Sequence, residues 1–231
     1  METGTPPAGT LRPLDANERR VLGVLIEKAK TTPDQYPLSL NAVVTGCNQK
    51  SNRDPVMNLD EEAVSRALAS LRECGAAAEV YGNGRLARYR HLAYDWLGSD
   101  KEDLAILGEL LLRGEQSEGD LRGRASRMDP IPDLNVLRTR LDSLAERGLI
   151  VWLSPPGRGR ILTHGLLPTE KLDKVRSQLA LAGGPAATAD APRPVASAPT
   201  AGTSLESRVA QLEATLAEAL DRLAALERPV G

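Results

Sequence analysis

The sequence predicts a mainly α-helical protein with small β-hairpins, built from two copies of one structural unit and a C-terminal coiled-coil helix. Apolar residues recur at helical spacing in several segments, and short extended runs flank glycine-containing turns. One pattern of residues also repeats at a fixed offset of 73 positions, which indicates an internal duplication. The chain of 231 residues, 41% hydrophobic and 26% charged, has the composition of a globular protein with one or two domains.

The composition excludes several classes of protein. The 29 basic and 31 acidic residues give a formal net charge of −2, so a uniformly basic coat for nucleic acid is excluded. No apolar run approaches the roughly 20 residues that span a bilayer, and the N-terminus lacks the basic and apolar regions of a signal peptide. Cys47 and Cys74 cannot by themselves form a disulfide framework or a complete zinc site. We therefore expect a cytoplasmic protein without membrane contact.

The first copy follows residues 1–13, a proline-rich segment that we expect to be disordered. Aspartates mark the starts of two helices and glycines mark two helix ends, as capping chemistry favours. An Asn-Gly turn between extended runs indicates a hairpin. The predicted elements are a helix from Asp15 to about Thr31 with Glu18 completing a capping box, a short helix ending near Gly46, a helix from Asp60 to Gly75, and a hairpin of residues 78–81 and 85–91.

The second copy repeats this order. A helix capped by Asp100 ends at Gly114, and a second helix runs from about Ser117 to Ala125. The third helix ends at Gly148, and a hairpin of residues 150–153 and 160–163 follows. The apolar residues that we expect this third helix to bury are Leu134, Leu137, Leu141 and Leu144.

The offset of 73 residues covers the last helix and the hairpin of each copy without a gap. It takes Gly75 to Gly148 and His91 to His164, as well as the leucine pattern between them. Three helices that lead into a two-stranded hairpin are the element order of a winged-helix domain, a helix-turn-helix with a β-wing. We therefore expect winged-helix domains at residues 14–97 and 98–170.

The C-terminal part of the sequence changes character. We expect a helical extension over residues 171–182 and a linker over 183–203, where 14 of 21 residues are Ala, Pro or Gly. Residues 204–228 carry apolar side chains at alternating spacings of four and three, the seam of a coiled coil. Because an isolated helix of this length is marginal in water, we expect it to pair, either as a homodimer or with another protein as a heteromer.

Several unusual segments are similar to the YceH family, a group of uncharacterised bacterial proteins. They are Asp34–Asn41, Cys47–Leu59, Leu110–Gly114 and Gly119–Ala125, within a resemblance that runs from about Leu14 to Leu167. The resemblance implies tandem winged-helix domains in a bacterial cytoplasmic protein. It implies little about function, and it does not extend to the linker or the C-terminal heptads.

Winged-helix domains place their third helix in the major groove and their wing against the DNA backbone. In the first copy that helix begins with Glu61 and Glu62, which would repel phosphate. In the second copy arginine and asparagine, which can contact base edges, point outward, and the wing adds further arginines. These candidate DNA-binding residues are Asn135, Arg138, Thr139, Arg140, Arg158 and Arg160. The alternative is that the arginines form ordinary solvated surface.

Two further segments have two interpretations each. In the first wing, Arg85, Arg88 and Arg90 either contact phosphate or pair with Glu73 and Glu79. The polar loop of residues 48–58 is either an interaction loop that contacts phosphate or peptide, or a structured connector whose amides cap helices. The candidate interaction residues of this loop are Asn48, Gln49, Lys50, Asn52 and Arg53.

We expect no catalytic, metal or cofactor site. His91 and His164 lack companion ligands at suitable spacing, so we expect structural roles for both. No nucleotide-binding loop or catalytic motif is present, so we do not expect an enzyme. We predict a DNA-binding or transcription-associated protein that binds double-stranded DNA and dimerises through its coiled coil. The alternative is a non-enzymatic scaffold that docks partner proteins.

Overall fold

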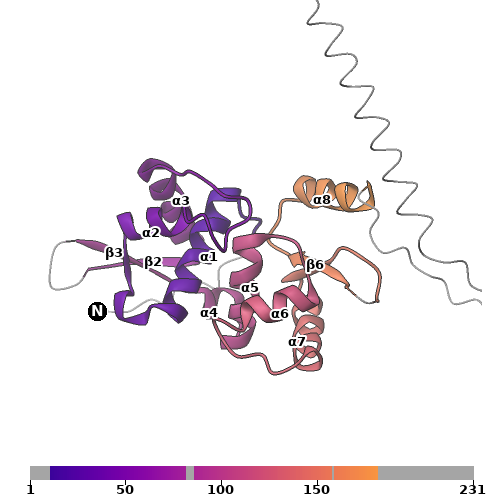
Figure 1. The fold of residues 1–231 in the computed structure, drawn as a ribbon. Helices are drawn as coiled ribbons and strands as arrows, with labels where there is room; N and C mark the ends of the chain where they lie inside the picture. The colour runs from indigo at the N-terminus through magenta and orange to yellow at the C-terminus, as the bar shows by residue number, and fades with distance from the viewer. Residues whose placement is uncertain (1–10, 82–85, 158, 182–231) are drawn as a thin grey trace, which may run out of the picture. The chain divides into compact units, whose positions relative to one another are not determined.

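The computed structural model describes residues 11–81, 86–157 and 159–181, all within one compact unit (Figure 1). This part of the chain is mainly helical, with two small antiparallel sheets, as the sequence predicts. The predicted linker, coiled coil and most of the N-terminal lead-in lie outside the described residues. None of the helices in the described ranges has the length and apolarity that a membrane span requires.

Two modules share one order of elements. The first module comprises α1 (Ala16–Thr31), the 3₁₀ turn η1 (Pro33–Gln35), β1 (Leu38–Ser39), α2 (Leu40–Cys47), α3 (Glu61–Glu73), β2 (Ala77–Tyr81), β3 (Ala87–His91) and α4 (Ala93–Leu97). The second module comprises α5 (Lys101–Arg113), β4 (Gln116–Ser117), α6 (Glu118–Ala125), α7 (Leu134–Glu146), β5 (Ile150–Trp152) and β6 (Ile161–His164), and α8 (Thr169–Leu181) follows it.

The two sheets have equivalent topologies. Each has three antiparallel strands, in the orders β1-β3-β2 and β4-β6-β5. Leu38 pairs with Tyr89 in the first sheet and Gln116 pairs with Leu162 in the second, so the strand residues Tyr89 and Leu162 are equivalent at the offset of 73, whereas the short first strands lie outside the gapless offset. The sequence predicts only the two-stranded hairpins. The third strand of each sheet has two residues, too few to show an alternating pattern.

Helix caps account for the element boundaries. Asp15, Asp60 and Asp100 accept hydrogen bonds from backbone N–H groups in the first turns of α1, α3 and α5, as predicted. Glu18 completes the predicted capping box through a 2.7 Å bond from the backbone of Asp15. The glycines that follow α3 and α7 have positive φ, +80° at Gly75 and +71° at Gly148, a conformation that L side chains rarely adopt.

The two modules pack against each other through α1 and α5 (Figure 1). Two glycines permit this close approach. A Cβ at Gly23 would lie 2.9 Å from Leu112, and one at Gly108 would lie 2.8 Å from Ile26. Because α1 also packs on α2 and α3, its residues 21–27 are buried on every side. The modules therefore share one hydrophobic core.

Replacement of Gly108 by alanine tests this contact. We expect Gly108→Ala to lower the free energy of unfolding by about 1–2 kcal/mol, because the clash with Ile26 exceeds the gain in helix propensity. Gly123→Ala in α6 is the matched control, since nothing lies within 4 Å of the added Cβ. The control should be neutral or stabilising by about 1 kcal/mol in urea denaturation followed by circular dichroism. Equal effects of the two substitutions would contradict the glycine-mediated packing.

Candidate functional site

The outer face of α7 carries the predicted base-contacting side chains. Asn135 and Thr139 are exposed, as expected, and the hydroxyl of Thr139 donates a 3.1 Å hydrogen bond to the carbonyl of Asn135. Leu134 differs from the prediction, because it is 37% exposed rather than buried. As the first residue of α7, it precedes the point where the helix meets the core, and Leu137, Leu141 and Leu144 are buried.

Arg138 is engaged by a carboxylate of the same chain. Its Nε and Nη2 donate hydrogen bonds of 3.1 and 2.9 Å to one oxygen of Glu118, at the start of α6. The Glu118 side chain is 6% exposed, so water solvates its charge little and the guanidinium of Arg138 compensates it. The hydrogen bond to Glu118 raises the pKa of the Arg138 guanidinium above its ordinary value. Any phosphate would compete with this carboxylate.

Arg140 points toward the N-terminus of α5. Its guanidinium lies 2.6 Å from Asp100, 3.0 Å from Asp103 and 3.3 Å from Glu102. Asp103 is buried, and burial raises the pKa of its carboxyl group. Arg140 therefore compensates an acidic cluster between α5 and α7, and the structure places it away from the outer face.

The exposed charge on the outer face of α7 is acidic on balance. Asp142 and Glu146 are exposed and follow Asn135, Arg138 and Thr139 at helical spacing. Among the described residues, Arg138 lines one pocket with Glu118, Asp142 and the wing residue Arg160. This face would repel the phosphates that flank a major groove.

The second wing contributes one described arginine. The guanidinium of Arg160 lies 3.5 Å from the ring centroid of Trp152, and its Nε donates a 3.4 Å hydrogen bond to the carbonyl of Ser154. Arg158 lies outside the described residues.

Arginines of the first wing are exposed on one face of β3. Arg88 and Arg90 alternate with the half-buried Tyr89, as the sequence predicts. Arg88 donates a 2.9 Å hydrogen bond to the carbonyl of Pro37, and within the described ranges neither arginine forms an ion pair. Glu79 is instead paired with Arg72. The predicted pairing with Glu73 and Glu79 is therefore wrong for Arg88 and Arg90, and Arg85 lies outside the described residues.

Arg53 makes the polar loop a structured connector. Its guanidinium is completely buried and donates hydrogen bonds of 3.2 and 2.6 Å to the two carboxylate oxygens of Glu27. Further bonds reach the carbonyl of Gly46 and the side-chain oxygen of Gln49. A buried bidentate pair of this kind positions the loop against α1. Arg53 is therefore unavailable to an external ligand.

Two asparagines of the loop also have internal partners. The side chain of Asn48 accepts a 2.7 Å bond from the backbone N–H of Leu59 and donates a 2.8 Å bond to the carbonyl of Leu59, which closes the loop. Asn52 has a positive φ of 59°, and its side-chain oxygen accepts bonds of 2.8 and 2.7 Å from Arg113 and Arg127 of the second module. Both side chains are thus engaged within the chain, which favours a structured connector, although through these contacts rather than through helix caps.

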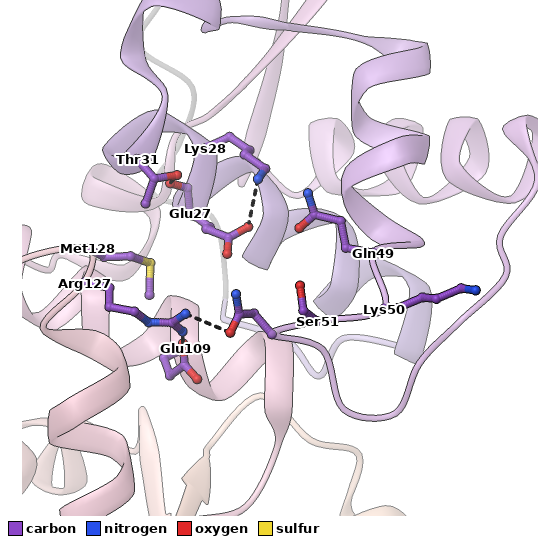
Figure 2. A pocket seen from close by; sticks show the side chains of 10 residues that line it. Glu27, Lys28, Thr31, Gln49, Lys50, Ser51, Glu109, Arg127 and Met128 are labelled. Carbon is purple, nitrogen blue, oxygen red and sulfur yellow. Dashed lines mark hydrogen bonds and ion pairs between the residues drawn. The ribbon is translucent and has the colours of Figure 1, made fainter.

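A pocket of about 580 Å³ lies between this loop, α1 and the second module (Figure 2). Lys50 is exposed at its edge, and Gln49 lines it beside Glu27. The buried Glu109 also lines the pocket, with Arg113 3.0 Å and Arg127 3.4 Å from its carboxylate oxygens. Burial raises the pKa of Glu109, and these arginines oppose that shift. The buried charges of the pocket are thus compensated within the chain.

Both histidines make the same local contact. The Nδ1 of His91 accepts a hydrogen bond from the backbone N–H of Ala93, and the Nδ1 of His164 accepts one from Leu166. Burial lowers the pKa of His91 to about 4 and that of His164 to about 3. Each neutral ring therefore caps the turn that follows its strand. Among the described residues, no group of three His, Cys, Asp or Glu is placed to hold a metal ion.

Replacement of Arg53 tests the connector. We expect Arg53→Ala to lower the free energy of unfolding by about 3–5 kcal/mol, because Glu27 would be left buried without a cation. Lys50→Ala, three residues earlier and exposed, should change it by less than about 0.5 kcal/mol. Urea denaturation measures both, and a small effect of Arg53→Ala would contradict the structural role.

The buried histidines predict a pH dependence of stability. Their pKa values in the folded chain lie below the ordinary value of 6.5, so the unfolded chain binds protons first as the pH falls. Their contribution is complete above about pH 6.5 and decreases toward pH 4, by up to about 1.4 kcal/mol per pH unit for each histidine. Urea denaturation between pH 7.5 and 5 should show this decrease, and His91→Gln should reduce it. A flat profile for the natural chain would contradict the burial of neutral rings.

Comparisons with known proteins place the chain in a family. Residues 14–158, more than half of the chain, match the family model described as "Protein of unknown function, DUF480". A UPF0502 protein of Rhodopirellula baltica is 55% identical over 179 residues, which cover 76% of each chain. A UPF0502 protein of Koribacter versatilis is 45% identical over 161 residues, 68% of this chain and 75% of the relative. A UPF0502 protein of Geobacter sulfurreducens is 53% identical over 130 residues, which span 59% of its own length.

These matches confirm the coarser part of the resemblance, namely an uncharacterised bacterial family, while the YceH name stays a prediction. The printed descriptions of the relatives give no function. The segments that carried the resemblance all fall within the matched region. This chain belongs to the DUF480 family, known among bacterial relatives as UPF0502, whose function is unknown.

Proposed function

We propose that this protein is a non-enzymatic, cytoplasmic adaptor in which the second of two winged-helix modules docks a basic segment of a partner protein. The order of three helices and a hairpin, repeated with equivalent three-stranded sheets, supports winged helices at residues 14–97 and 98–170. A winged helix offers its third helix to its ligand. The ligand therefore has to suit the outer face of α7.

The acidic balance of that outer face carries the proposal. Asp142 and Glu146 are exposed, Arg138 is bound to Glu118, and Arg140 is bound to the cluster at the start of α5. A lysine- or arginine-containing segment complements these charges, whereas a DNA backbone does not. Apolar surface is also available in the first turn of α7, where Leu134 is 37% exposed and Val136 is 39% exposed.

Double-stranded DNA is the second candidate ligand. It is supported by the exposed Arg88 and Arg90, which are free of ion pairs with described residues, on a β-wing. Two cations on one strand release few counterions, so binding through this wing would be weak and sensitive to salt.

Site-specific photo-crosslinking in cells tests the adaptor. A photo-crosslinking amino acid at position 139 on α7 should give a protein adduct, whereas one at the exposed position 65 on α3 should not. Charge reversal by Asp142→Lys should abolish the adduct, because the partner segment is cationic. An adduct that persists in Asp142→Lys, or equal adducts at both positions, would argue against the proposed face.

DNA binding distinguishes the two candidates. In fluorescence anisotropy with a random-sequence duplex, we expect only non-specific affinity, with Kd on the order of 10⁻⁴–10⁻⁶ M at physiological salt. Arg138→Ala should change that affinity by less than about twofold, because its guanidinium is already occupied by Glu118. A Kd near 10⁻⁸ M that weakens about tenfold in Arg138→Ala would support the DNA reader instead.

Dimerisation through residues 204–228 completes the proposal. The heptad positions Leu212 and Leu216 lie on the predicted seam. In sedimentation equilibrium we expect the full chain to have twice the monomer mass, and the double substitution Leu212→Asp with Leu216→Asp to restore the monomer. Thr215→Asp, off the seam, is the control and should stay dimeric. A monomeric natural chain would contradict the homodimer. It would indicate instead that the coiled coil pairs with a second protein.

A further inference from the structure

A second cavity, of about 510 Å³, lies where the two modules meet α8. We call it the arginine groove, because Arg19 and Arg20 of α1 and Arg113 of α5 line it. Its remaining walls come from the polar loop, β6 and α8, so segments far apart in the sequence meet here. This volume is within the usual range of small-molecule sites.

Two of these arginines lack carboxylate partners. Arg20 is 2% exposed, and its Nη1 and Nη2 donate to the backbone carbonyls of Cys47 and Pro55. Arg19 is half-buried and donates to the carbonyl of Leu14. Neither forms an ion pair with any described residue, in contrast to Arg53 and Arg113. Two neighbouring cations are therefore partly or wholly removed from water without a direct carboxylate partner, an arrangement that costs free energy.

Unsatisfied polar atoms at the same place point to a ligand. Within the described ranges, Nε of Arg20 and Oγ1 of Thr163 are buried and have no hydrogen-bond partner. Thr163 has no exposed surface, and both residues line the groove. Native structures rarely leave such atoms unpaired. The two donors suit an oxygen atom of an anion.

The charges around the groove agree with an anionic ligand. Burial lowers the pKa of both Arg19 and Arg20, the direction expected of cations without counterions, although Asp15 and Asp54 partly oppose it. The carboxylate of Asp15 already accepts two backbone N–H groups as the cap of α1. Lys171 of α8 adds a further cation to the lining.

One wall of the groove is apolar, and Asp54, Glu115 and Gln178 line other parts of it. Leucines of α5 and proline, methionine and valine side chains of the loop and α8 form this wall. They are Pro55, Met57, Leu110, Leu111, Leu167 and Val175. A hydrated inorganic ion would leave this wall unused, whereas an alkyl or aryl group would cover it.

We propose that the arginine groove binds a small organic anion with an apolar body, its carboxylate or similar head held by Arg19, Arg20 and Thr163. The ligand contacts both modules and α8 at once, so its binding stabilises their packing. It thereby acts as an effector of the two-module unit. This inference does not depend on which macromolecule binds α7.

Octanoate is a suitable probe, with octanamide as its uncharged analogue of equal length. In calorimetric titration of the full chain, we expect octanoate to bind at one site per chain and to raise Tm. Octanamide should bind at least about tenfold more weakly, because it lacks the charge-assisted hydrogen bonds to the arginines. Equal binding of the two, or no binding of octanoate, would overturn the proposal. Inorganic phosphate binding as tightly as octanoate would overturn the apolar part of it.

Substitutions locate the site. Arg19→Met removes the guanidinium but keeps an unbranched side chain, and Thr163→Val keeps the shape of the side chain; each should weaken octanoate binding, by about tenfold for the arginine. Arg88→Met, an exposed arginine on the first wing, is the matched control and should bind as the natural chain does. If circular dichroism shows that Arg20→Met folds, its octanoate affinity is a further test of the site. If Arg20→Met does not fold, the octanoate affinity of Arg19→Met decides whether the groove is the site. Unchanged octanoate affinity in Arg19→Met and Thr163→Val would place the ligand elsewhere and refute this site.

Discussion

The close contact between α1 and α5 is the constraint on which the rest of the described structure depends. Gly23 and Gly108 leave no room for a Cβ against Leu112 and Ile26, so the two helix backbones approach closely. This contact joins the cores of both modules and buries α1 on every side. It also brings the polar loop against α5, where the backbone N–H of Asp54 donates to the carbonyl of Leu112. The arginine groove follows from this packing, because residues of both α1 and α5 line it.

The distribution of ion pairs separates structural from functional arginines. Arg53, Arg138 and Arg140 each neutralise a carboxylate that the fold removes from water, so their charges are used within the chain. Arg19 and Arg20 are the reverse case, because the fold desolvates them beside one groove and supplies only backbone carbonyls. Three of the arginines that suggested function in the sequence are thus compensated within the chain, whereas the candidates Arg88 and Arg90 form no ion pair with described residues. Arg19 and Arg20 lie in α1, and the apolar pattern of this helix predicted only its core residues.

Local chemistry explains which elements could be predicted. Caps such as Asp60 and Asp100 and helix-ending glycines such as Gly148 act on their own neighbours, so the helix boundaries follow closely from the sequence. The strands of residues 38–39 and 116–117 were missed, because their extended conformation comes from pairing with distant strands. Leu134 was expected in the core because helical periodicity does not show where along its length a helix meets its neighbours.

The sequence by itself determined the longer helices and the two hairpins, because periodicity, capping and turn chemistry are local properties, whereas the five-residue helix α4 was not predicted. It also indicated the polar loop as an unusual segment, without deciding between a ligand and a connector. Tertiary structure decided that Arg53 meets Glu27, that Arg138 meets Glu118, and that Arg19 and Arg20 meet no carboxylate of the described chain. The physical reason is that an ion pair depends on distance and desolvation, and both are set by residues far apart in the sequence.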